Sequence, residues 1–316
     1  MSSEKSIVFM GTPEFASHSL EKLIASDFTI KAVITAPDRP AGRGQKVMFS
    51  NVKETALKHE LPVLQPTNLK DPEFIQELEK LNADLFVVVA FRMLPEVVWS
   101  MPRLGTINLH GSLLPNYRGA APINWAVING ETETGVTTFF IEKEIDTGKV
   151  IDTAKTPISK EDNAGTVHDR LMEIGANLLS TTVQKIFNGE ASGTPQKDLI
   201  TGELKEAPKI FKEDCKIDWN QPAEKVFNKI RGLSPYPAAF TSIQNTENQS
   251  QKSVKIFQTT LTSKPSKAGE LRQEEGLFIG CADYFLEIET LQLEGKKRME
   301  TEEFLRGFSF ENWEIV

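Results

Sequence analysis

The sequence predicts an α/β fold: a Rossmann-like, mostly parallel sheet with helices on both faces, followed by a small barrel-like β domain. Short β-rich runs alternate with helical patterns through the first half of the chain, as in parallel sheets with crossover helices. The pattern then changes to successive β runs after a segment rich in Gly, Pro, Lys and Glu. The 316 residues suffice for two domains of ordinary size.

The first half contains five predicted strands with helices between them. The run Ser6–Met10 ends in Gly11-Thr12-Pro13, and Pro13 suits the first turn of a helix. The other predicted strands are Ile30–Ala36, Asp84–Ala90, Thr106–His110 and Gly135–Ile141. The intervening helices are predicted at Glu14–Ala25, Asn51–His59, Asp71–Leu81 and Pro122–Ile128.

A longer helix closes the predicted first domain, which spans residues 1–189. Its apolar positions lie on one stripe, and Gly189 supplies a stop. That stripe consists of Val167, Leu171, Ile174, Leu178 and Ile186. We expect residues 190–208 to form an interdomain linker and residues 209–316 to form the second domain. This domain has one helical segment, Pro222–Arg231, and β runs at Val254–Leu261, Gly276–Cys281 and Tyr284–Leu291.

Composition excludes several classes of protein. With 39% hydrophobic and 25% charged residues, the chain is typical of a globular protein with a real core. The apolar run Leu85–Phe91 is too short to span a bilayer, and Ile7–Met10 is too short for a secretory signal. Cys215 and Cys281 are far apart and have no CxxC motif, so neither a disulfide framework nor a zinc site is indicated. We expect a cytoplasmic protein without a metal.

The formal net charge of −8 argues against bulk attraction to nucleic acid or to an anionic membrane. Local basic segments remain possible exceptions. Between residues 252 and 272 five basic residues stand against the single acid Glu270; taken alone, the run also fits a solvated surface loop. The five are Lys252, Lys255, Lys264, Lys267 and Arg272.

A second basic segment follows the second predicted strand. Arg39, Arg43 and Lys46 lie among Gly and Pro residues and would form a basic finger. Such a finger can bind phosphates or enter a groove of a nucleic acid. An ordinary basic surface loop explains the same residues equally well.

The most informative stretch is Gly105–Gly119. Within it, Asn108 and His110 are two apart on a predicted strand and therefore point to the same face, while Ile107 and Leu109 point into packing. An amide donor beside an imidazole suits the stabilisation of an oxyanion next to a proton-transfer group. A buried structural histidine is the competing interpretation.

Three more familiar sites are disfavoured. The turn at Gly11 lacks the Gly-x-Gly-x-x-Gly fingerprint of dinucleotide binding. The Asp146-Thr147-Gly148 motif occurs once, whereas aspartic proteases need two carboxylates. Gly111-Ser112 lacks the nucleophile elbow of esterases. Asp146 follows the strand next in sequence to that of His110, and could reach across to hold the tautomer or charge of its imidazole.

These motifs resemble the methionyl-tRNA formyltransferase family, within the enzymes that use 10-formyltetrahydrofolate. The resemblance covers nearly the whole chain. In the first domain it rests on Gly11–Phe15, Pro37–Gly44, Asn108–Pro115, Arg118–Pro122 and Asp146–Gly148. In the second it rests on Ile217–Trp219, Ile230-Arg231 and Pro235–Ala238.

The resemblance implies formyl transfer from 10-formyltetrahydrofolate to the α-amine of initiator methionyl-tRNA in the bacterial cytoplasm, by a monomeric enzyme. Asn108, His110 and Asp146 would be catalytic, and the loop Ser112, Leu113, Leu114 and Pro115 would bind folate. Arg39, Arg43 and Lys46 would bind tRNA, as would an OB-like C-terminal barrel. The alternatives are formylation of an amino sugar nucleotide and a non-catalytic RNA-binding protein.

One position departs from the family pattern. After the strand that includes Val87–Ala90, the family commonly has an aromatic residue followed by Gly, whereas here Phe91 is followed by Arg92. A long side chain therefore replaces a glycine near the expected place of the pterin ring. Either donor affinity differs, or the loop takes another course.

Overall fold

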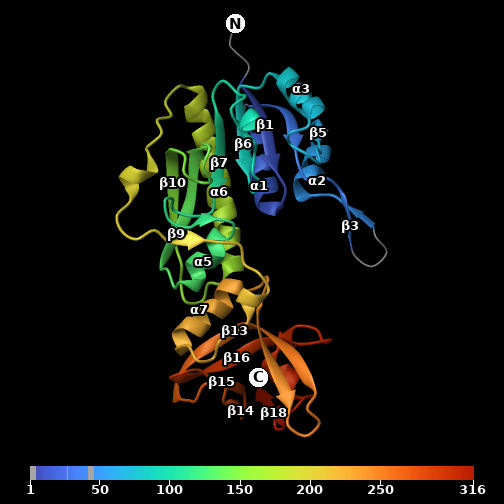
Figure 1. The fold of residues 1–316 in the computed structure, drawn as a ribbon, viewed down its shortest axis with the longest axis vertical. Coiled ribbons are helices and arrows are strands. Elements are labelled where there is room, and N and C mark those ends of the chain that lie inside the picture. The colour runs from blue at the N-terminus through green and yellow to red at the C-terminus, as the bar shows by residue number, and fades with distance from the viewer. Residues whose placement is uncertain (1–4, 27, 42–45) are drawn as a thin grey trace. The chain divides into compact units, whose positions relative to one another are not determined.

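The chain forms two compact units (Figure 1). The structure, a computed structural model, describes residues 5–26, 28–41 and 46–316. The first unit comprises residues up to Gly119, together with Gly135–Thr156 and Asp169–Glu206. The second comprises Ala120–Thr134, Pro157–His168 and Ala207–Val316. The division into domains at residues 1–189 and 209–316 remains a prediction.

The first unit is built on a seven-stranded sheet with the order β10-β9-β7-β6-β1-β2-β5. Its strands are β1 (Ser6–Gly11), β2 (Thr29–Ile34), β5 (Val63–Leu64), β6 (Leu85–Val89), β7 (Thr106–His110), β9 (Glu133–Phe140) and β10 (Val150–Pro157). The five strands from β7 to β5 are parallel, and β9 is antiparallel to β7. The predicted mostly parallel sheet is confirmed.

Helices cover both faces of this sheet, as predicted. They are α1 (Glu14–Ile24), α2 (Asn51–Lys58), α3 (Pro72–Leu81), α4 (Glu96–Trp99) and α6 (Ala164–Phe187). On one face, Phe74 and Leu78 of α3 pack with Val8 and Val88 of the sheet. On the other face, α6 approaches β7 so closely that a Cβ at Gly175 would lie 3.0 Å from the Leu109 side chain.

Strongly patterned elements match their predicted bounds most closely. The strand Thr106–His110 and the helix Pro122–Ile128 have the predicted limits, and Asp71 caps α3 by accepting the Glu73 N–H at 2.9 Å. Sequence reasoning missed β10, since Val150–Pro157 has no strong apolar run and is a strand because it lies beside β9. It also missed the short elements β3 (Arg39–Ala41), β4 (Lys46–Met48), β5, α4, β8 (Arg118–Gly119), the 3-10 helix η1 (Gln196–Leu199) and β11 (Glu206–Ala207).

The second unit is a near-closed antiparallel barrel with the strand order β14-β15-β16-β13-β12-β18, and β17 pairs with β16. Its strands are β12 (Ala239–Asn245), β13 (Gln251–Pro265), β14 (Leu271–Gln273), β15 (Leu277–Gly280), β16 (Tyr284–Leu293), β17 (Met299–Glu300) and β18 (Trp313–Ile315). Its helices are α5 (Pro122–Ile128), η2 (Glu213–Cys215), α7 (Ala223–Leu233) and α8 (Thr301–Leu305). Helix α7 contributes Val226, Ile230 and Leu233 to the barrel core.

The basic run from Lys252 to Arg272 is a strand-rich segment and not a loop. Lys252 and Lys255 are three residues apart on a regular stretch of β13, so their side chains point to opposite faces. Arg272 forms ion pairs with Glu270 and Glu274, at 2.7 and 3.7 Å. The five residues therefore do not form one continuous positive track.

Among the described helices, none has both the length and the apolar composition that crossing a bilayer requires.

Candidate active site

Strand β7 carries the candidate catalytic residues to one edge of the parallel sheet. The chain runs from β1 to β2 on one side and returns to β6 and β7 on the other, and ligands of open α/β sheets bind near such a reversal, beyond the carboxyl ends of the strands. Asn108 is paired with Val88 of β6 and shares its face. Leu109 points the other way, toward α6.

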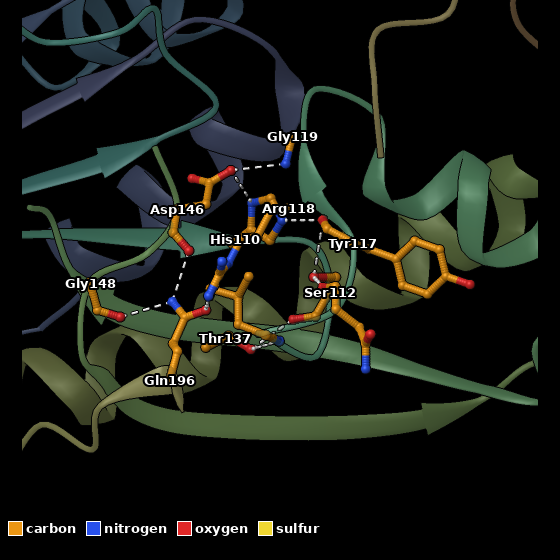
Figure 2. A network of polar contacts seen from close by, with 11 residues as sticks. His110, Ser112, Tyr117, Arg118, Gly119, Thr137, Asp146, Gly148 and Gln196 are labelled. Carbon is orange, nitrogen blue, oxygen red and sulfur yellow. Dashed lines mark hydrogen bonds and ion pairs between the residues drawn. The ribbon is translucent and has the colours of Figure 1, made fainter. Parts of the chain in front are cut away.

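His110 is buried, and each of its ring nitrogens faces a polar partner (Figure 2). Its Nε2 lies 2.8 Å from the Tyr117 carbonyl oxygen; since a carbonyl only accepts, Nε2 carries a hydrogen. Its Nδ1 lies 3.9 Å from Oδ2 of Asp146. That distance is too long for a hydrogen bond but allows electrostatic stabilisation of an imidazolium. The reach of Asp146 to His110, foreseen from the sequence, is present in the structure.

Asp146 lies in the loop between β9 and β10. Because β9 is antiparallel to β7, β9 ends beside Ile107 and not beside His110, so the loop must turn back along the sheet. The Asp146 carboxylate accepts the Gly119 N–H at 3.0 Å, and the residue has a left-handed φ of 54°. Aspartate adopts this conformation more readily than most residues other than glycine, but it is still uncommon.

Asn108 has a partly exposed side chain on the same face as His110. Within the part of the chain that the structure describes, its amide makes no side-chain hydrogen bond. The amide N–H groups are therefore available to a bound molecule.

The predicted folate loop, Ser112–Pro115, is fixed by internal hydrogen bonds. The Ser112 hydroxyl donates to the Asn116 carbonyl at 2.7 Å. Thr137 of β9 donates its hydroxyl to the Ser112 carbonyl at 2.7 Å and accepts the Leu114 N–H at 3.1 Å. Leu114 and Pro115 are buried, and Leu113 is partly exposed. Ser112 thus holds the shape of the loop through a hydroxyl that is already engaged.

Gln196 is a site residue that sequence reasoning missed. It lies in the predicted linker, yet its side chain is buried and donates to the backbone carbonyls of Asp146 and Gly148, each at 2.8 Å. A single glutamine in a polar segment gives no signal of its own. Only the fold brings it beside the loop that holds Asp146.

Two of the predicted tRNA-binding residues, Arg39 and Lys46, lie on the paired strands β3 and β4. Arg39 is exposed on β3, and Lys46 is the first residue of β4. The side chain of Lys46 and the whole of Arg43 lie outside the part of the chain that the structure describes. At the base of this strand pair, Lys53 donates to the Asp38 carboxylate at 2.5 Å and to Gln65 at 2.8 Å. The hydrogen bond from Lys53 lowers the pKa of Asp38, so this anchor remains ionised at neutral pH.

Arg92, the departure from the family pattern, is held by the neighbouring loop. Its guanidinium donates to the carbonyl of Thr67 at 2.9 Å and to that of Pro66. The side chain therefore joins the loop after β6 to the loop after β5.

Comparison with known proteins identifies both parts of the chain. Residues 4–183 match the family described as "Formyl transferase", and residues 209–309 match "Formyl transferase, C-terminal domain". The chain is 54% identical over 307 residues to the methionyl-tRNA formyltransferase of Bacteroides fragilis, covering 96% of this chain and 94% of that protein. It is 51% identical over 307 residues to that of Flavobacterium johnsoniae, covering 96% of each.

Solved structures share the fold at lower identity. An N-formyltransferase from Helicobacter canadensis, in complex with folinic acid and dTDP-3-aminofucose, superposes with a TM-score of 0.65 at 23% identity, over 94% of this chain and 100% of that one. HypX from Aquifex aeolicus with tetrahydrofolic acid gives 0.60 at 20% identity, over 95% of this chain and 46% of that one. With two matched domains and close relatives along nearly its full length, the chain belongs to the formyl transferase family, among the methionyl-tRNA formyltransferases.

Proposed function

We propose that this protein transfers the formyl group of 10-formyltetrahydrofolate to the α-amine of initiator methionyl-tRNA, with Asn108, His110 and Asp146 as its catalytic residues. The His110–Asp146 pair, with Asn108 on the same face of β7, is the observation that supports this site. The acceptor is supported by relatives more than 50% identical along the chain.

Asn108 and His110 stabilise the charge that develops on the formyl oxygen. Attack of the neutral amine on the formyl carbon forms a C–N bond and places negative charge on that oxygen. The Asn108 amide donates a hydrogen bond to it, and protonated His110 supplies positive charge from the same face of β7. Burial of His110 strengthens this effect because bulk water does not screen it.

Asp146 and His110 also assist the transfer of a proton from the attacking amine to N10 of the folate. The attacking nitrogen must lose a proton, and N10 of the folate must gain one as its bond to the formyl carbon breaks. Since the Tyr117 carbonyl holds Nε2–H, Nδ1 is the ring atom left to exchange a proton. The Asp146 carboxylate, 3.9 Å away, stabilises the charged imidazolium during that exchange.

The substrates are assigned to the surroundings of this pair. The Ser112–Pro115 loop forms a wall of the folate site, with its shape fixed by Thr137. Arg39, Arg43 and Lys46 contact the acceptor stem, and the C-terminal barrel binds the tRNA backbone. A monomeric state and a cytoplasmic location belong to the same proposal.

One experiment tests the reaction and the residues together. Tetrahydrofolate release is followed spectroscopically after mixing the donor with methionyl-tRNA, and separately with an amino sugar nucleotide. We expect release with the tRNA alone, and a kcat lower by about 100- to 1000-fold in Asn108→Ala and in His110→Ala, the scale of one lost oxyanion donor. His18→Ala, a histidine paired with Glu173 away from this site, serves as the control.

The other outcomes are decisive as well. Tetrahydrofolate release with the sugar nucleotide alone would mean that the enzyme transfers a formyl group to an amino sugar and not to methionyl-tRNA. No release with either would favour a non-catalytic RNA-binding protein. Near-normal turnover in Asn108→Ala or His110→Ala would remove that residue from the mechanism.

A further inference from the structure

Gln196 is the most deeply buried polar side chain of the segment between the two matched family regions. The residue is only 3% exposed, although residues 190–208 are otherwise largely exposed. Burying a primary amide is unfavourable unless its donors and acceptor are satisfied. The local structure is therefore built around what Gln196 binds.

Both ends of the Gln196 amide are used, and by different segments (Figure 2). Its nitrogen donates to the carbonyls of Asp146 and Gly148, each at 2.8 Å. Its oxygen accepts from Nε and Nη2 of Arg118, at 3.0 and 2.6 Å. Because carbonyls only accept and guanidinium groups only donate, the amide has one possible orientation.

These two segments are the ones that place the Asp146 carboxylate. Gly119, next to Arg118, donates its N–H to that carboxylate at 3.0 Å, and the Asp146 backbone is in the left-handed region. Gln196 thus binds the backbone of the Asp146 loop. It also binds Arg118, whose neighbour Gly119 donates to the Asp146 carboxylate. Loss of Gln196 would release both constraints at once.

We propose that Gln196 is a positioning residue for formyl transfer, which holds the Asp146 carboxylate in register with Nδ1 of His110. The proposal rests on the proposed function of Asp146 and His110. Gln196→Met keeps the length of the side chain but removes its donors and its acceptor. We expect kcat to fall by about 10- to 100-fold, since a displacement of about 1 Å can cost that much, with KM for both substrates within about threefold.

A double-mutant cycle with Asp146→Asn separates positioning from general support of the fold. If Gln196 acts through Asp146, Gln196→Met costs less than about threefold in kcat once the carboxylate is gone. An equal loss in both backgrounds would overturn the proposal. Gln184→Met is the matched control: Gln184, on α6, donates to Asn188 just beyond the end of that helix, and the kcat of this variant should stay at the wild-type level.

A second variant and a spectroscopic readout cover the remaining outcomes. Gln196→Glu keeps an oxygen that accepts from Arg118, but it places a second oxygen against the carbonyls of Asp146 and Gly148, where the amide donated. Its kcat should therefore fall, which keeps the test available even if Gln196→Met folds poorly. The chain has four histidines, so the ring ¹⁵N signals of His110 can be assigned with His110→Ala. We expect the Nδ1 signal to shift in Gln196→Glu while those of His18, His59 and His168 stay in place.

These measurements distinguish failure of this proposal from failure of the proposed function. Normal turnover in Asp146→Asn would remove Asp146 from catalysis, and the His110 signal would still report whether Gln196 places the carboxylate. An unchanged His110 signal in Gln196→Glu would overturn the positioning role, even if Asp146 proves essential.

Discussion

Gly148 offers the sharpest test of how closely the Asp146 loop must fit. A Cβ added at Gly148 would lie 1.7 Å from the Phe140 carbonyl oxygen, so the two must move apart by about as much again to reach the 3.4 Å of ordinary contact. The obstacle is backbone, which cannot rotate away as a side chain does. Gly148 is two residues from Asp146, so the displacement would be felt there. It is larger than the roughly 1 Å misplacement that can lower a rate by two orders of magnitude.

We therefore expect Gly148→Ala to lower kcat by about 100-fold while KM for the tRNA and for the folate changes little. The assay is tetrahydrofolate release under saturating donor, with thermal unfolding measured in parallel. Gly202→Ala is the matched control, because a Cβ at Gly202 meets nothing within 4 Å. Wild-type kcat in a folded Gly148→Ala would refute the argument that the loop has no freedom to shift.

Two further predictions concern stability and reactivity. Burial acts to raise the pKa of Asp84, but hydrogen bonds from Ser6 and Arg103 outweigh it and lower that pKa, so the stabilisation is complete at neutral pH and is lost as pH falls through the folded-state pKa. Asp84→Asn should lower the free energy of unfolding, measured with urea at pH 7, by about 1–2 kcal/mol. The difference between the wild type and the variant should become smaller below about pH 4, and a difference that grows on acidification would contradict this. Burial raises the pKa of the Cys281 thiol to about 12, so iodoacetamide at pH 8 should label it only after denaturation, and rapid labelling of the native protein would be the contrary result.

Local patterns in the sequence predicted what local forces determine. Alternation of Ile107 and Leu109 with Asn108 and His110 was enough to predict the strand and its two faces, because side chains on a strand alternate. The oxyanion-type pair followed from the same spacing. Its roles stay a prediction until the variants are measured.

Long-range pairing determined what the sequence could not predict. The course of the loop around Asp146 depends on β9 being antiparallel to β7, and no local signal reports strand direction. Gln196 is 50 residues from Asp146 in the chain, and only the fold brings them together. The basic run beginning at Lys252 is divided between two strand faces, which a count of charges along the sequence does not reveal.

The way the two units share the chain has a consequence for synthesis on the ribosome. Helix α5 packs in the second unit, where Ile128 leaves no room for a side chain at Gly232 of α7, made about a hundred residues later. The Asp146 loop likewise gains its hydrogen bonds from Gln196 only after residue 196 has been synthesised. A nascent chain that ends within residues 190–195 therefore lacks Gln196, which holds the Asp146 loop, and α7, which packs against α5. We expect neither half, cut there, to behave as a finished protein.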